Sequence, residues 1–90
     1  MQFGFLGISY QTADLKMREQ AAFTDEKKME FFHMAEEAGV DQCMILSTCN
    51  RSEVFYLFEE TNQADQMYRL YQEMFSEADL GQYIRRGQGE

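Results

Sequence analysis

The chain has 90 residues, enough for one hydrophobic core and too few for two. Hydrophobic residues make up 44% of it, so a packed domain is expected rather than a disordered segment. The formal net charge of −8 argues against a nucleic-acid surface made by this chain alone, because phosphate binding relies on clustered Lys and Arg. The sequence contains no transmembrane run, no signal-peptide pattern, no Cys/His cluster for zinc and too few cysteines for a disulfide framework. These observations predict a single cytoplasmic domain without a metal site.

The N-terminal part of the chain predicts a strand followed by a short helix. Residues 2–9 carry apolar side chains between glycines and are predicted to form a strand. Residues 10–15 are polar and turn-like, and residues 16–23 are expected to form a short helix that closes at Phe23.

A longer helix is predicted next, from clear start and stop signals. Thr24 is a suitable N-cap, and Asp25 and Glu26 place negative charge in the first turn, where it suits the helix dipole. The helix is expected to run to about Ala38, with Gly39 as its C-terminal cap. Its apolar face is predicted to contain Phe31, Met34, Ala35 and Ala38.

Two apolar runs then predict a pair of neighbouring strands, one ending near Thr48 and one spanning residues 52–59. The second run is apolar on both faces, which is typical of a central strand. One face should carry Val54, Tyr56 and Phe58, and the other Phe55 and Leu57.

The C-terminal third predicts one more helix and one more strand. Residues 61–63 are expected to be a connector, and residues 78–80 to end the helix. A last short strand is predicted over residues 82–86. The helix between them is indicated by an i, i+3, i+4, i+7 stripe made of Met67, Leu70, Tyr71 and Met74. The resulting β-α-β-β-α-β order predicts an α+β, ferredoxin-like fold, with an antiparallel sheet covered by two main helices.

The connection between the two central strands holds the most chemistry. Residues 47–53 read Ser-Thr-Cys-Asn-Arg-Ser-Glu, so Cys49 ends a buried strand and Arg51 follows two residues later. The thiolate is the nucleophilic form of cysteine, and a nearby guanidinium together with turn N–H groups would stabilise it. Cys49 is therefore a candidate nucleophile, with Thr48, Asn50 and Arg51 as candidates for orienting a substrate.

Each of these residues also has a structural interpretation. A cysteine at a strand end is often a small buried hydrophobic residue. Arg51 could form a surface ion pair with Glu53 or Glu59, and Thr48 could be an ordinary β-branched strand residue.

Two other residues with reactive side chains are expected to be structural. Cys43 lies within an apolar run and is predicted to fill the core. His33 falls among glutamates on the polar face of its helix, so we expect a solvated residue rather than a general base for Cys49.

Two motifs together resemble those of glutamyl-tRNA reductase, the first committed enzyme of the five-carbon route to tetrapyrroles. The first, residues 7–23, has a glycine strand, a Thr-Ala pair and then Arg-Glu before a hydrophobic end. The second, residues 46–56, contains Ser-Thr-Cys-Asn-Arg and is similar to the family's nucleophile motif almost without change. The resemblance covers nearly the whole chain, but only the family's N-terminal catalytic domain.

The resemblance implies a reaction and roles for the motif residues. Cys49 would attack the ester of glutamyl-tRNA, giving a thioester and releasing the tRNA. NADPH would then reduce the thioester to glutamate-1-semialdehyde for tetrapyrrole (porphyrin and heme) biosynthesis. Thr48, Asn50 and Arg51 would line the glutamyl pocket, with Arg51 holding the substrate carboxylate.

The sequence also departs from the family pattern. Tyr10 stands where the family commonly has histidine, Asp14 where it commonly has proline, and residues 83–90 contain no counterpart of a later family histidine. The chain has no Gly-x-Gly-x-x-Gly dinucleotide fingerprint. Residues 1–90 are therefore expected to be one domain of a longer enzyme, whose NADPH-binding and homodimerisation regions lie outside this chain. Alone, the domain is not expected to reduce substrate.

A second hypothesis is a non-catalytic ferredoxin-like interaction or regulatory module. In it Cys49 is structural, and the sheet edge or the methionine-rich last helix binds a partner. The two hypotheses differ in the reactivity that they predict for Cys49.

Overall fold

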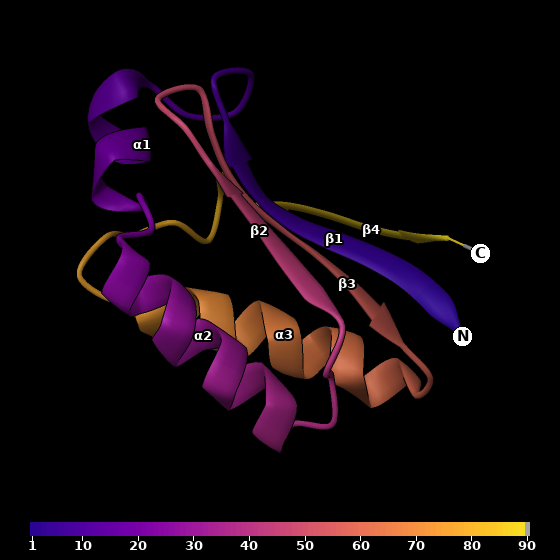
Figure 1. Ribbon diagram of the computed structural model, residues 1–90. Coiled ribbons are helices and arrows are strands. Elements are labelled where there is room, and N and C mark those ends of the chain that lie inside the picture. Colours follow the sequence, from indigo (N-terminus) through magenta and orange to yellow (C-terminus); the bar gives the residue numbers. More distant parts are fainter. Residues whose placement is uncertain (90) are drawn as a thin grey trace.

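The computed structural model describes residues 1–89 and shows a four-stranded antiparallel sheet with strand order β2-β3-β1-β4. The strands are β1 (Gln2–Ser9), β2 (Cys43–Ser47), β3 (Arg51–Phe58) and β4 (Arg85–Gly89). The helices are α1 (Leu15–Gln20), α2 (Asp25–Glu37) and α3 (Thr61–Met74). All of these helices lie on one side of the sheet, and the other face carries no helix from the described part of the chain (Figure 1). The predicted ferredoxin-like α+β fold is confirmed.

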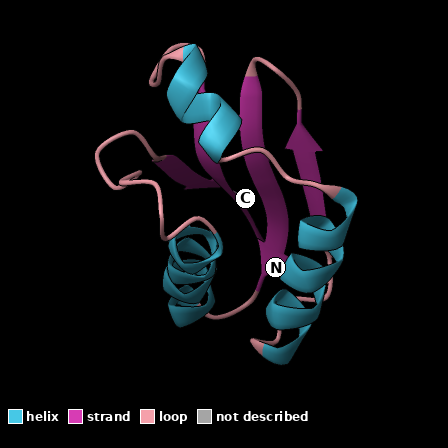
Figure 2. Cartoon of the chain, turned by 90° about the vertical axis from the view of Figure 1, so that its left-hand side faces the viewer, coloured by secondary structure: helices cyan, strands magenta, loops and turns pink. Residues whose placement is uncertain are grey.

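The core lies between the sheet and the two long helices, α2 and α3, which run below the strands in Figure 2. β3 alternates between buried and half-buried residues, as predicted, and its pairing with both β1 and β2 makes it a central strand. The apolar stripe of α3 is confirmed, with Met67 and Tyr71 fully buried. From α2, Phe31 and Ala35 enter the same core.

The signals predicted at both ends of α2 are confirmed. The Thr24 side chain accepts a hydrogen bond of 3.1 Å from the backbone N–H of Lys27, and Asp25 and Glu26 occupy the first turn. Gly39 follows the last turn with φ = 90°, a left-handed conformation that favours glycine.

The boundaries predicted for α1 are wrong at its end. The helix stops at Gln20, where the N–H of Ala21 donates to the Arg18 carbonyl at 3.2 Å and the N–H of Ala22 donates to the Glu19 carbonyl at 3.4 Å. Phe23, predicted as the last helical residue, lies in the connection to α2 and packs edge-on against the Phe31 ring at 5.7 Å. Burial of this aromatic ring therefore decides the course of the chain after α1.

The predicted connector at residues 61–63 is also wrong, since these residues form the first turn of α3. The Gln63 side chain accepts hydrogen bonds from the N–H groups of Glu59 and Glu60, at 2.9 and 3.1 Å, and so fixes the helix start. α3 ends at Met74 rather than at residues 78–80, with Phe75 as its C-cap.

The last strand lies three residues later than predicted, at 85–89 instead of 82–86. Leu80 is buried, and its carbonyl oxygen accepts hydrogen bonds from the N–H groups of Tyr83 and Ile84, at 2.8 and 3.2 Å. This turn delays the strand until Arg85. Within residues 1–89, none of the helices is long and apolar enough to span a membrane.

Candidate active site

Cys49 lies at the tip of the short turn that joins β2 to β3. The turn is closed by a backbone hydrogen bond of 2.8 Å from the Thr48 N–H to the Arg51 carbonyl. Inside it, the Asn50 N–H donates to the Thr48 hydroxyl oxygen at 3.1 Å. Because the turn is short and points away from the core, the side chains of Thr48, Cys49 and Asn50 are all exposed. The Cys49 sulfur lies 4.0 Å from Oδ1 of Asn50, a weak contact that leaves it accessible.

Two neighbouring segments fix the position of this turn. The Tyr10 N–H, just after β1, donates to the Asn50 carbonyl at 2.8 Å. Arg18 of α1 donates from Nε to the Cys49 carbonyl at 3.0 Å and from Nη1 to the Ala13 carbonyl at 2.8 Å. α1 lies at the end of the sheet where the β2–β3 turn and the segment after β1 come together (Figure 1). Arg18 therefore links α1, the segment after β1 and the backbone of the candidate nucleophile.

A buried polar network supports the site from below. The Ser52 hydroxyl donates to the Ala21 carbonyl at 2.6 Å. The Tyr71 hydroxyl donates to the Ser52 carbonyl at 2.8 Å and lies 3.0 Å from the Ser52 hydroxyl oxygen. Burial raises the pKa of Tyr71 to about 12, so the phenol stays neutral and keeps its proton for this network. The start of β3 is thus tied to the end of α1 and to α3.

Arg51 contacts a carboxylate instead of the candidate sulfur. Its Nη1 lies 3.4 Å from Oε1 of Glu53, and its side chain is 42% exposed while that of Glu53 is 18% exposed. Within residues 1–89, the hydrogen bonds and ion pairs of Arg51 do not include the Cys49 sulfur. The sequence left open a surface ion pair between Arg51 and Glu53, and this ion pair is present.

Arg51 and Glu53 line a cavity of about 260 Å³ on the open face of the sheet. Its rim includes Tyr10, whose backbone holds the β2–β3 turn. The complete lining is Phe5, Gly7, Ser9, Tyr10, Gln11, Arg51, Glu53 and Arg85. A binding space with charged walls therefore adjoins the turn that carries Cys49.

The other cysteine and the histidine lie elsewhere, in the environments predicted for them. Cys43 is half-buried against the core, and burial raises the pKa of its thiol to about 12. His33 pairs with Glu37 through Nε2 and Oε1 at 3.1 Å, and its side chain is 76% exposed. Neither residue belongs to the Cys49 site.

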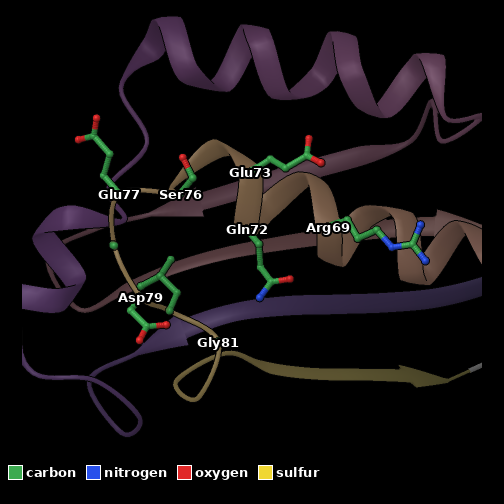
Figure 3. Close-up of a pocket in the computed structure, with 9 residues that line it drawn as sticks. Arg69, Gln72, Glu73, Ser76, Glu77, Asp79 and Gly81 are labelled. Carbon is green, nitrogen blue, oxygen red and sulfur yellow. The ribbon is translucent and has the colours of Figure 1, made fainter.

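A second cavity, of about 580 Å³, lies between the end of α3 and the segment that follows it. Its lining includes the acidic residues Glu73, Glu77 and Asp79 and the cation Arg69. Their polar ends project in different directions and do not converge on one point (Figure 3). The cavity contains no cysteine, so the candidate chemistry stays at the β2–β3 turn.

Sequence reasoning missed Arg18 and the backbone of Tyr10 as parts of the site. Both residues belong to the first motif, residues 7–23. From the sequence, only the family resemblance indicated that this motif and Cys49 act together. Their contacts span 31 and 40 residues of chain, so only the tertiary fold places them at the turn.

The fold and site define an α+β domain that presents one exposed cysteine on a turn held by an arginine. Comparison with known proteins gives the family. The family model "Glutamyl-tRNAGlu reductase, N-terminal domain" matches residues 6–90. The chain belongs to the glutamyl-tRNA reductase family, and the resemblance in its two motifs is confirmed.

Individual relatives agree and show how much of them this chain represents. The glutamyl-tRNA reductase of Alkaliphilus metalliredigens is 36% identical over 77 residues, covering 83% of this chain and 18% of that protein. That of Akkermansia muciniphila is 32% identical over 93 aligned positions, covering 100% of this chain and 27% of that protein. That of Aromatoleum aromaticum is 40% identical over 65 residues, covering 71% and 16%. The chain thus spans about a quarter or less of the length of these relatives.

Proposed function

We propose that this domain performs the acyl-transfer half of an NADPH-dependent glutamyl-tRNA reductase reaction. The Cys49 thiolate attacks the ester carbon of glutamyl-tRNA, and a C–S bond forms as the bond to the terminal ribose oxygen breaks. The ribose oxygen takes a proton from solvent water as the tRNA leaves, and a glutamyl thioester stays on Cys49. Reduction of the thioester to glutamate-1-semialdehyde, for tetrapyrrole biosynthesis, then regenerates the thiol.

The observation that carries this proposal is the exposure of Cys49 on a turn whose backbone is anchored by Arg18. A nucleophile must be reachable by a bulky substrate and must stay in place while it reacts. An exposed sulfur on a short, hydrogen-bonded turn meets both needs. Cys43 is held in place by the β2–β3 pairing but is half-buried, so it does not meet the first need.

The neighbours of Cys49 supply the proposed glutamyl contacts. The Arg51 guanidinium is proposed to hold the free carboxylate of the substrate, since its planar fork suits a carboxylate. The Thr48 hydroxyl accepts the Asn50 N–H and keeps its own proton available for the substrate. The exposed amide of Asn50 offers both a donor and an acceptor beside the sulfur.

The residues of this chain do not fit NADPH. Dinucleotides bind at a glycine-rich loop between a parallel strand and a helix, whereas the pairings within residues 1–89 are antiparallel. The proposal therefore assigns the cofactor, and homodimerisation, to regions of the whole enzyme outside this chain. The proposed location is the cytoplasm, where two free cysteines suit a reducing environment.

Trapping the acyl-enzyme tests the proposal. The whole enzyme that carries this domain is mixed with glutamyl-tRNA labelled in the glutamate, without a reductant, and the labelled peptide is identified by mass spectrometry. We expect a thioester on the peptide that contains Cys49, lost in Cys49→Ala and retained in Cys43→Ala. Absence of label on Cys49 in the folded, unsubstituted enzyme would reject the proposal.

The interaction-module hypothesis is favoured by one observation, the exposed apolar residues Phe3 and Met44. If Cys49 stays unlabelled and a Met44→Glu variant loses a bound protein, the module interpretation replaces the catalytic one. A labelled Cys49 decides for catalysis.

A further inference from the structure

The cavity beside Arg51 is built around a glycine in the central strand β1. Gly7 pairs with Glu53 of β3 on one side and with Arg85 of β4 on the other. Its φ of 149° favours glycine, and a Cβ there would overlap the Ser52 carbonyl oxygen and lie 2.6 Å from the Glu53 Cα. Residue 7 must therefore stay without a side chain, because the β3 backbone already fills the space that a Cβ would take, and the cavity lies between the side chains of Glu53 and Arg85.

The charges around this space are unequal. Two cations, Arg51 and Arg85, and one anion, Glu53, line the cavity. Glu53 lies 3.4 Å from Arg51 and offsets part of its charge. Arg85 donates instead to a neutral group, Oε1 of Gln11, at 3.5 Å. Among residues 1–89, the ion pairs bring no carboxylate to Arg85, so its positive charge faces the cavity without compensation.

We propose that Arg85 is a specificity residue for the acyl group, binding the free carboxylate of the glutamyl substrate from β4 while Arg51 binds it from β3. This inference rests on the function proposed above. Arg51 follows Cys49 by two residues, a span of at most about 7 Å, and a glutamyl group separates its ester carbon from its carboxylate by a similarly short aliphatic chain. The hydrogen bond from Tyr10 to Asn50 joins the cavity rim to the turn, so one substrate can reach both.

The need for a second cation follows from Glu53. A carboxylate that enters beside Arg51 also approaches Glu53 and is repelled by it. Arg85, on the other side of Gly7 from Glu53, makes the total charge of the cavity lining positive again. A glutaminyl group has nearly the same shape as a glutamyl group and differs in charge, so Arg85 acts mainly on the choice between these two acyl groups.

The test compares two substrates that differ only in this group. Single-turnover acylation of Cys49 is measured in the whole enzyme, without a reductant, using one tRNA charged with either glutamate or glutamine. We expect Arg85→Gln to lower the ratio of the two rates, glutamate over glutamine, by about tenfold or more, as for loss of a charge-assisted hydrogen bond. Using the ratio removes general effects of charge on tRNA attraction.

Arg86→Gln is the matched control, because it makes the same charge change one residue later. Arg86 faces the helices, where it pairs with Asp65 at 2.9 Å and covers the Tyr68 ring at 4.7 Å. We expect its ratio to match that of the unsubstituted enzyme. Arg85→Lys retains the charge and should keep most of the preference for glutamate.

Each outcome bears on the inference. An unchanged ratio in Arg85→Gln, an equal loss in Arg86→Gln, or a loss in Arg85→Lys as large as in Arg85→Gln would overturn the role of Arg85. Failure of the unsubstituted enzyme to acylate Cys49 with either tRNA is distinguishable from these results, and would overturn both the proposed function and this inference.

Discussion

Cys43 and Cys49 lie six residues apart in the sequence, and the fold gives their sulfurs opposite environments. Cys43 is half-buried, and burial raises the pKa of its thiol to about 12. Cys49 is exposed at the end of the hairpin. One strand therefore carries a half-buried thiol and leads directly to an exposed one.

Alkylation should separate the two thiols. At pH 7, a thiol with a pKa near 12 is about one part in 10⁵ thiolate, so we expect iodoacetamide to modify Cys49 several-fold faster than Cys43. Mass spectrometry of the digested protein after short exposure measures both rates. Equal, slow labelling of the two cysteines in the folded domain would contradict the nucleophile assignment.

Arg18 contacts the candidate nucleophile through its backbone carbonyl, and we propose it as a positioning residue. Arg18→Ala removes the hydrogen bonds to the Cys49 and Ala13 carbonyls, and a displaced nucleophile loses near-attack geometry. We expect the maximal rate of Cys49 acylation in the whole enzyme to fall roughly tenfold while the half-saturating concentration of glutamyl-tRNA changes little. The exposed Arg69→Ala in α3 is the control. An unchanged maximal rate would remove Arg18 from the site.

At the scale of elements, Ser52 joins β3 to the end of α1 and to α3. The Ser52 hydroxyl donates a hydrogen bond to the Ala21 carbonyl. The Ser52 carbonyl accepts a hydrogen bond from the Tyr71 hydroxyl, which also lies 3.0 Å from the Ser52 hydroxyl oxygen. Within the described residues no buried side-chain nitrogen or oxygen lacks a hydrogen-bond partner, the Ser52 and Tyr71 hydroxyls included. The turn that carries Cys49 is therefore supported by buried hydrogen bonds that join β3 to the residue after α1 and to α3.

Ser52→Ala should weaken this connection. It leaves a buried carbonyl without its donor, so we expect the free energy of unfolding to fall by about 1–3 kcal/mol. Urea denaturation followed by circular dichroism measures the change. Ser76→Ala, at an exposed position, should have a much smaller effect. Equal effects of the two substitutions would show that the network contributes little to stability.

At the scale of the whole molecule, alkaline pH should destabilise the fold. Burial raises the pKa of Tyr71 from 10.0 to about 12, raises that of Cys43 from 9.0 to about 12, and also raises that of Tyr56. A raised pKa in the folded state favours the protonated form, so this stability is fully present below about pH 9 and is lost as pH rises toward 12.

The loss can be measured and assigned. We expect the free energy of unfolding to be steady from pH 7 to about 9 and then to fall by several kcal/mol as the pH approaches 12, at roughly 1.4 kcal/mol for each unit by which a pKa is raised. Urea midpoints across this range give the profile. Tyr71→Phe should have a shallower decline above pH 10, and a decline as steep as in the unsubstituted protein would exclude Tyr71 as a cause.

The sequence by itself determined the order of the elements, both ends of α2 and the central place of β3. It also determined that Cys43 packs against the core and that His33 is a solvated residue apart from Cys49. These features depend on alternation, on capping residues and on nearest neighbours, which are local in the chain. Two boundaries were not predicted from the sequence. The Gln63 side chain caps a first turn of α3 in a segment of turn-like composition, and the turn at the buried Leu80 delays the start of β4.

Tertiary structure alone decided how the site is assembled. The Arg18 anchor, the Tyr10 contact and the row formed by Glu53, Gly7 and Arg85 join residues from different strands and helices. Sheet register sets which side chains lie opposite one another, and register depends on packing of the entire sheet against its helices. The candidate nucleophile could thus be named from its motif, whereas its support and the charges around it required the fold.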